Sequence, residues 1–348
     1  QEARFDRGQA LSHLGLWRSA ERAYTELLTA EPFHRQAAIA RERAVIEQGF
    51  KAQAGYEFFQ SEGRGTLADI RRHTVSGSVG VPLPVEGAIL SGDYAYTDFP
   101  TGDFVRHAYG IRLKGRMSPL LTGLLRFTYN DYLAPLGPTQ NYEAALNYRP
   151  LDLASVTVSY SREDIQDNPE ALSQQIQRDI VTIGGETALT VRTAVGAAYS
   201  YANYSDGNVR NAFELFGSHQ FSLYPRIFKA TYRLSYQDFS RATIFPPEGS
   251  SMPIVHPYFA PSNFFTNALT LEWRHYVQKD MFIGANQCYY HVQWTPAIES
   301  LDTVFSNTIQ GEFLCDLTPR FTISARGLIS RSPTYDADQV SLQLQYRF

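Results

Sequence analysis

The sequence predicts an all-β transmembrane barrel of about 16 antiparallel strands, preceded by a small α-helical segment. Three observations support this prediction. Beyond residue 50, apolar and polar residues alternate with a period of two, which is the period of a β-strand. The chain contains 22 Tyr and 22 Phe against 3 Trp and 3 Met, an aromatic excess that suits the two water–lipid boundaries of a barrel. The connections between the expected strands are alternately short and long.

Residues 1–48 follow a helical period instead, with apolar residues spaced three and four apart. Gly8, Ala20, Tyr24 and Pro32 resemble the pattern of a tetratricopeptide repeat, a helix pair of 34 residues. One repeat cannot bury its own apolar face. We therefore expect either a small cap packed under the next region or the last repeat of a longer array. The chain begins at Gln1 within an expected helix, which suggests that a leader or further repeats precede it.

Residues 49–348 are predicted to form the barrel. The final strand alternates without error and ends on an aromatic residue, as the last strand of bacterial outer-membrane barrels does. Its apolar face consists of Val340, Leu342, Leu344, Tyr346 and Phe348. No stretch of 18 apolar residues is present, so a transmembrane helix is excluded. Because every backbone group must be paired inside a bilayer, we expect the strands to close on themselves.

The expected connections fall into two classes. Tight ones lie at 83–86, 118–119, 150–152, 224–225, 279–280 and 318–319, and longer ones near 62–70, 164–177 and 240–262. Short periplasmic turns and long external loops are typical of bacterial outer-membrane barrels. We therefore expect this location, with both chain ends in the periplasm. The 240–262 loop should lie outside, where it either folds over the pore mouth as a gate or only crowns the rim.

Basic residues gather on the polar face of two neighbouring strands. A charge on the lipid face costs about 2–4 kcal/mol at the midplane, so these side chains should point into the lumen. The candidate substrate-guiding residues are Arg106, Arg112, Lys114, Arg116 and Arg126. A cationic wall attracts an anionic solute. The alternative is that these cations pair with acids on the polar faces of other strands, namely Glu143, Glu163, Glu186, Glu214, Glu272 and Glu312.

Other function classes find little support. The formal net charge of −4 gives no indication of the basic surface that nucleic-acid binding requires. Histidines are scattered and no triad spacing is present, so we expect no enzyme, with a barrel hydrolase as the remaining catalytic alternative. No ligand cluster for a metal or cofactor is found. Cys288 and Cys315 fall on the apolar face, and in the simplest hairpin register they lie out of step, so we expect free thiols.

The order of a tetratricopeptide-like segment, a barrel of this size and a Phe-terminated last strand resembles a known architecture. It is similar to the C-terminal part of outer-membrane exopolysaccharide exporters, those for cellulose, poly-N-acetylglucosamine and Pel. The resemblance implies a pore for a polysaccharide, helices that contact periplasmic or inner-membrane secretion partners, and an assembly signal at Tyr346 and Phe348. A general diffusion porin and a sheath around a multihaem cytochrome are the alternatives.

Overall fold

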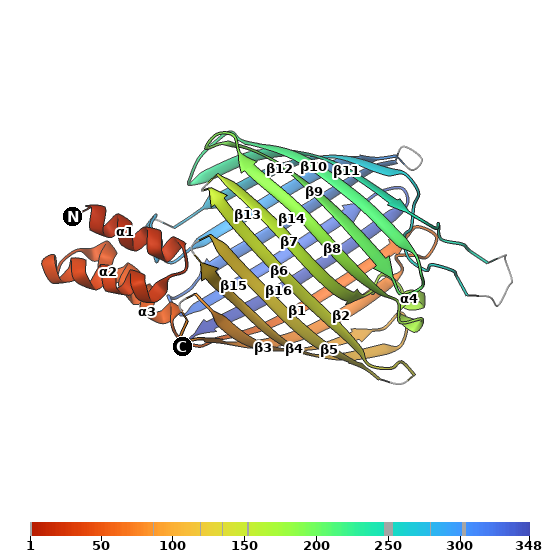
Figure 1. Ribbon diagram of the computed structural model, residues 1–348, viewed down its shortest axis with the longest axis horizontal. Helices are drawn as coiled ribbons and strands as arrows, with labels where there is room; N and C mark the ends of the chain where they lie inside the picture. The colour runs from red at the N-terminus through yellow and green to blue at the C-terminus, as the bar shows by residue number, and fades with distance from the viewer. Residues whose placement is uncertain are drawn as a thin grey trace.

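The computed structural model is a closed barrel of 16 antiparallel strands with three helices at one end (Figure 1). It describes every residue except 1, 86, 119, 134, 152, 247–252, 279 and 301–303. Each strand pairs with its neighbours along the chain, and the first pairs with the last, which confirms the predicted fold class. The strands are β1 (Lys51–Gly63), β2 (Ile70–Pro82), β3 (Ile89–Phe99), β4 (Phe104–Ser118), β5 (Leu121–Tyr132), β6 (Thr139–Leu151), β7 (Ala154–Asp164), β8 (Gln177–Ala188), β9 (Thr193–Tyr204), β10 (Val209–Gln220), β11 (Arg226–Phe239), β12 (Phe264–Tyr276), β13 (Cys288–Glu299), β14 (Val304–Asp316), β15 (Phe321–Arg331) and β16 (Tyr335–Arg347).

The outer surface of the barrel is apolar because alternate side chains of every strand point outward. In β16 the exposed side chains include Val340, Leu342 and Leu344, whereas Ala337 and Arg347, on the opposite face, are buried. Large exposed hydrophobic residues recur in this way around the whole barrel. A water-soluble protein rarely leaves so large an apolar surface open, and an apolar band is what a bilayer covers.

The two ends of the barrel differ. The helices α1 (Glu2–His13), α2 (Trp17–Ala30) and α3 (Arg35–Glu47) lie with the C-terminus at one end, which we call the helical end (Figure 1). The predicted tight turns lie there, but the prediction of a tight turn at 279–280 is wrong, because residues 277–287 separate β12 from β13. Glu86, Pro119, Asp152 and Lys279 are outside the described residues. The three predicted long connections lie at the opposite end, the loop end, and 247–252 within the longest are also outside. None of the described helices is long and apolar enough to cross a membrane.

A small apolar core holds the helices together. Ala20, Tyr24, Leu27 and Ala40 are buried between them. Gly8 permits the close approach of α1 to α2, because a Cβ there would lie 2.3 Å from the Tyr24 ring. Burial raises the pKa of the Tyr24 hydroxyl, which accepts a hydrogen bond from Gln9 at 2.8 Å.

The helices are fixed to the turns at the helical end by specific contacts. The Gln9 side chain pairs with the backbone of Ile283 in both directions, at 3.0 and 2.6 Å. Gly284, in a left-handed conformation with φ of 110°, packs against α3, and a Cβ there would lie 2.8 Å from Ala40 Cα. Arg18 Nη1 donates to the carbonyl oxygen of Pro84 at 2.7 Å. The helical segment is therefore docked on the barrel and does not hang from a free linker.

A buried ionic network connects α3 to both ends of the barrel sequence. Glu47 contacts Arg43 at 2.9 Å, Lys51 at 2.5 Å and Arg347 at 3.0 Å. Asp316 contacts the same two arginines, Arg43 at 3.3 Å and Arg347 at 3.6 Å. Burial alone would raise the pKa of Glu47, but the surrounding cations hold it below its usual range. Removing one partner from such a buried group is costly, so the network fixes the position of α3.

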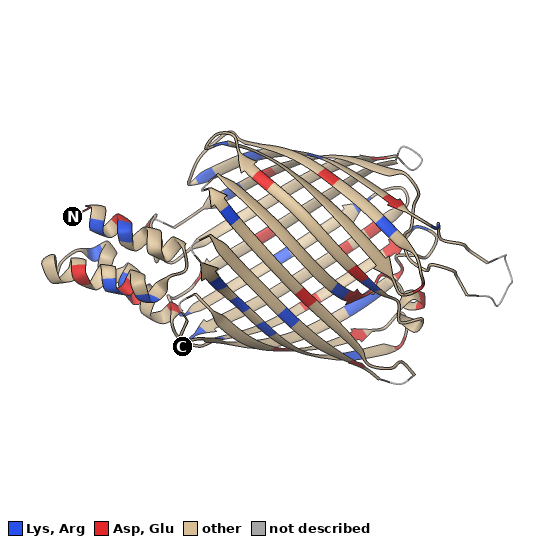
Figure 2. Cartoon of the chain, viewed as in Figure 1, with Lys and Arg blue, Asp and Glu red and all other residues tan. Residues whose placement is uncertain are grey.

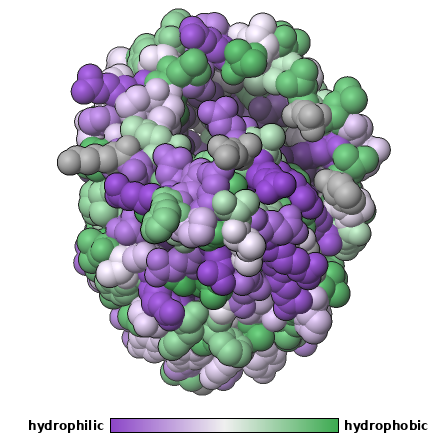
Figure 3. Space-filling model, turned by 90° about the vertical axis from the view of Figure 1, so that its left-hand side faces the viewer, coloured by the Kyte–Doolittle hydropathy of each residue, from purple (hydrophilic) through white to green (hydrophobic). Residues whose placement is uncertain are grey.

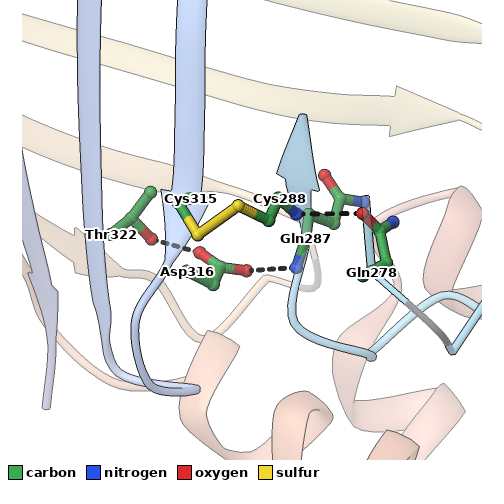
Figure 4. Close-up of a disulfide and its surroundings, with 6 residues drawn as sticks. All are labelled: Gln278, Gln287, Cys288, Cys315, Asp316 and Thr322. Atoms are coloured by element: carbon green, nitrogen blue, oxygen red, sulfur yellow. Dashed lines mark hydrogen bonds between the residues drawn. A yellow bond between two sulfur atoms is a disulfide. The ribbon is translucent and has the colours of Figure 1, made fainter. Parts of the chain in front are cut away.

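Cys288 and Cys315 form a disulfide, so the expectation of free thiols is wrong (Figure 4). Residues 300–303 connect β13 to β14, and this register places the two cysteines directly opposite each other, with a Cα–Cα distance of 4.0 Å. The assumed hairpin register was the source of the error. Asp316, beside the disulfide, accepts hydrogen bonds from the Gln287 backbone at 3.1 Å and from the Thr322 hydroxyl. The disulfide thus adjoins the ionic network.

Candidate functional site: the lumen and its two ends

The predicted cations line the lumen, and an acid that was not predicted lies among them. Arg112 on β4 is directly opposite Arg126 on β5, and two like charges so placed repel. Asp93 on β3 lies 2.8 Å from Arg126 and 3.9 Å from Arg112. Its carboxylate occupies the space beside Gly110, where a Cβ would lie 2.2 Å from Asp93 Oδ2. The glycine therefore allows one acid to serve both arginines.

The structure divides the predicted cationic group in two. Arg106 donates to Thr97 at 3.0 Å, and with Arg126 it lines a lumen cavity of about 430 Å³. Lys114 and Arg116 instead line a separate cleft of about 300 Å³ at the helical end. Among the described residues these two cations form no ion pair. Charges of both signs are spread over the strands (Figure 2), so the lumen is not uniformly cationic.

Three of the acids named in the alternative, Glu163, Glu214 and Glu272, pair with other arginines and not with the predicted cations. Glu163 contacts Arg178 at 2.6 Å, and Glu214 contacts Arg233 at 3.1 Å. Glu272 lies 3.4 Å from Arg274. The first two pairs join neighbouring strands, whereas Glu272 and Arg274 both lie on β12. The group on β4 and β5 differs in having Asp93 as its one acid within 4 Å among the described residues. The position of Asp93 on the polar face of its strand was a signal that could have identified it.

At the loop end, one buried side chain joins three connections. Asn168, 2% exposed, donates to the carbonyl oxygens of Leu67 at 2.9 Å and Pro257 at 2.8 Å. Its own oxygen accepts from the Ala171 backbone at 2.8 Å and so caps the short helix α4 (Pro169–Ser173). The β1–β2, β7–β8 and β11–β12 connections therefore meet at a single amide.

An apolar cluster seats these connections on the barrel wall. Tyr258, from the β11–β12 connection, stacks on Tyr204 with ring centroids 4.6 Å apart and packs near Phe239. Asp206 accepts hydrogen bonds from the Tyr258 hydroxyl at 2.9 Å and contacts His256 at 2.7 Å. Burial raises the pKa of Tyr258. Residues 256–261 of the 240–262 loop thus pack inward on lumen-facing residues, whereas the described residues on either side of 247–252 project away from the barrel (Figure 1). We call these joined connections the loop plug.

The barrel is similar to solved outer-membrane structures. The sequence matches no protein-family model and no curated protein. A structure described as a bacterial polysaccharide outer membrane secretin has a TM-score of 0.70 at 12% identity, covering 86% of this chain and 99% of that one. The crystal structure of Pseudomonas aeruginosa OccK3 has a lower TM-score of 0.46 at 11% identity, covering 86% of this chain and 95% of that one. The first likeness shows the fold: this chain is a β-barrel of the bacterial outer-membrane kind.

Proposed function

We propose that this chain is an outer-membrane pore that exports a polysaccharide from the periplasm to the cell surface. The observation that carries the proposal is the helical segment, residues 1–48, docked on one end of the barrel formed by residues 49–348. A pore for small solutes has no need of a docked helical segment at its entrance. The fold likeness to a polysaccharide secretin supports the same choice.

The helical end faces the periplasm in this proposal. Bacterial outer-membrane barrels have short turns on the periplasmic side and longer loops outside. Here β2 and β3, β4 and β5, and β14 and β15 are joined by short turns at the helical end, whereas α4 and the longest connection lie at the loop end. The tetratricopeptide-like helices would then meet periplasmic or inner-membrane secretion partners. Phe33, 98% exposed at the tip of the helical segment, is one side chain available for such contact.

The lumen suits a hydrated polymer. Conduction requires contacts that are numerous and weak, because tight binding stalls the passenger. Ser, Thr, Gln and Asn side chains alternate along the inner face with isolated charges. We assign Arg106, Arg112, Lys114, Arg116 and Arg126 to guidance of an anionic or partly acidic polymer.

The barrel-assembly signal is assigned to Tyr346 and Phe348. Both side chains are exposed on the outer face, and their rings make an edge-to-face contact with centroids 4.9 Å apart. Deletion of Phe348 should lower the amount of folded barrel in the outer membrane and leave synthesis unchanged. Normal levels of heat-modifiable protein in the deletion strain would refute this assignment.

Polymer secretion by cells tests the proposal. Cells that lack the chain should lose surface polysaccharide and retain it in the periplasm, and the intact chain should restore export. Uptake of small neutral solutes into proteoliposomes separates export from the general porin alternative. Restored solute uptake without any effect on surface polymer would favour the porin. Co-purification of a multihaem cytochrome that fills the lumen would favour the sheath.

A further inference from the structure

The helical segment and the barrel wall enclose a cleft of about 300 Å³ at the helical end. Leu14, Trp17 and Arg18 line it from the helices, and Lys114 and Arg116 line it from β4. The cleft therefore exists only while the helices are docked. Figure 3 looks onto this end, where hydrophilic side chains gather over the helices.

The described residues that line the cleft carry more positive than negative charge. Lys114 and Arg116 have no acidic partner in the part of the chain that the structure describes, unlike Arg112 and Arg126, which share Asp93. Arg18 donates to the carbonyl oxygens of Leu83 and Pro84, which hold its guanidinium without neutralising it.

The one described carboxylate at the cleft does not cancel this charge. Glu47 also lines the cleft, but its oxygens are taken by Arg43, Lys51 and Arg347. Among the described residues of the lining, an anion that enters would therefore meet cations and no free acid. Because the cleft is partly enclosed, these charges act with less screening than charges on an open surface.

The neutral part of the lining suits a sugar ring. Trp17 packs with one side on the helical core and also lines the cleft, so its indole offers an apolar surface beside the cations. Gln48 Nε2 already donates to Glu21 and to the Ala44 carbonyl oxygen, so Gln48 offers its amide oxygen, and Thr122 a hydroxyl, to sugar hydroxyl groups. A volume of about 300 Å³ is at the small end of ligand sites, which fits one or two sugar residues.

We propose that this cleft binds an acidic sugar residue, such as a uronate, of the polymer as it enters the barrel. The carboxylate would lie between Lys114, Arg116 and Arg18, and the ring would lie against Trp17. This inference rests on the proposed export function and adds the class of substrate and the place of first contact. The helical segment then serves as one wall of the entrance site.

Binding of a defined oligosaccharide to the full chain in detergent tests the inference. The probe is trigalacturonate, and maltotriose is the neutral comparison, both measured by isothermal titration calorimetry. We expect trigalacturonate to bind wild-type protein and Lys114→Gln/Arg116→Gln to weaken it at least tenfold. Trp17→Ala should weaken binding as well. The matched control is Arg192→Gln/Arg226→Gln, which removes two exposed cations at the same end, one in the β8–β9 turn and one at the start of β11, and should leave binding unchanged.

Several results would overturn the inference. Equal weakening by the control pair would reduce the effect to overall charge, and equal binding of maltotriose would remove the role of the carboxylate. Full displacement of the sugar by dispersed phosphatidylglycerol at equal concentration would assign the cleft to a lipid headgroup. Heat-modifiable mobility verifies that each variant is folded. If wild-type cells export polymer but the protein binds no trigalacturonate, the entrance site fails while export stands; if the chain exports no polymer, the proposed function itself fails.

Discussion

The carboxylate of Asp93 occupies the space that Gly110 leaves open on the neighbouring strand. A Cβ at position 110 would lie 2.2 Å from Asp93 Oδ2, so any larger residue must push the acid away. From this position Asp93 reaches both Arg126 and Arg112. The charge balance of this part of the lumen therefore depends on a residue that has no side chain.

Gly110→Ala should displace Asp93 and leave Arg112 and Arg126 opposite each other without their shared acid. We expect a loss of about 1–2 kcal/mol in the free energy of unfolding, the low end for charged hydrogen bonds because both arginines are over one-third exposed. Urea unfolding in lipid vesicles measures it. Gly92→Ala on β3 is the control, since a Cβ there meets nothing within 4 Å. Equal losses in both variants would show that Asp93 is not the cause.

Lumen cations should set the ion preference of the open pore. Replacing Arg112 and Arg116 together by Gln removes two positive charges from the wall and should shift the reversal potential in a salt gradient toward cations. Asp93→Asn should shift it toward anions, because it removes the local acid. Single-channel recording in a planar bilayer measures both. An unchanged anion preference in a correctly folded double variant would remove the guidance role, and a channel that never conducts would favour a plugged lumen or a cytochrome sheath.

Asn168 should hold the loop plug closed. Asn168→Asp keeps an oxygen that can accept from the Ala171 backbone but loses the donor to Leu67 and Pro257. We expect more frequent and larger channel openings in this variant, because the three connections are no longer joined. Asn168→Ala should open at least as often, since it also loses the cap of α4. If conductance in both variants equals that of wild type, the plug does not depend on this amide.

Docking of the helices should weaken in acid. The pKa of Glu47 is lower in the folded protein than in the unfolded chain, so its contribution to stability is complete above the unfolded value and is lost as pH falls through the folded value. Protease cleavage near Gly49 should therefore increase below about pH 4. Glu47→Gln should be cleaved readily at pH 7 as well. The substitution leaves Arg43 and Arg347 buried without this acidic partner, which destabilises the docked helices by about 3–5 kcal/mol. Cleavage independent of both pH and this substitution would contradict the role of the network.

The orientation of the barrel can be checked on whole cells. Pro333, exposed in the β15–β16 turn at the loop end, should react with an impermeant thiol reagent when replaced by Cys. Val191, 90% exposed in the β8–β9 turn at the helical end, should react only after the outer membrane is opened. Gly249 and Lys279, also natural choices for the two sides, are outside the described residues. The reverse labelling pattern would place the helices outside the cell.

The period-two pattern was enough to predict the barrel, because half of each strand must be apolar in lipid and an open edge is not tolerated there. The disulfide was missed because cysteine pairing depends on the register of the hairpin. The centre of the turn between β13 and β14 was assumed wrongly, and in that register Cys288 does not lie opposite Cys315. Asn168 was missed because its partners are backbone carbonyls of distant loops, which leave no trace in the sequence. The sequence pattern places Asp93 on the polar face of its strand. Its contact with two arginines could not be predicted, because it depends on the absence of a side chain at Gly110 on the neighbouring strand.

The contact between Glu47 and Arg347 spans nearly the whole chain. Arg347 reaches α3 only after β16 has paired with β1, so the helices find their complete binding surface only on a closed barrel. Contacts of such long range form late in folding. Docking of the helices therefore depends on closure of the seam: a barrel in which β1 and β16 are unpaired lacks part of the surface to which α3 binds.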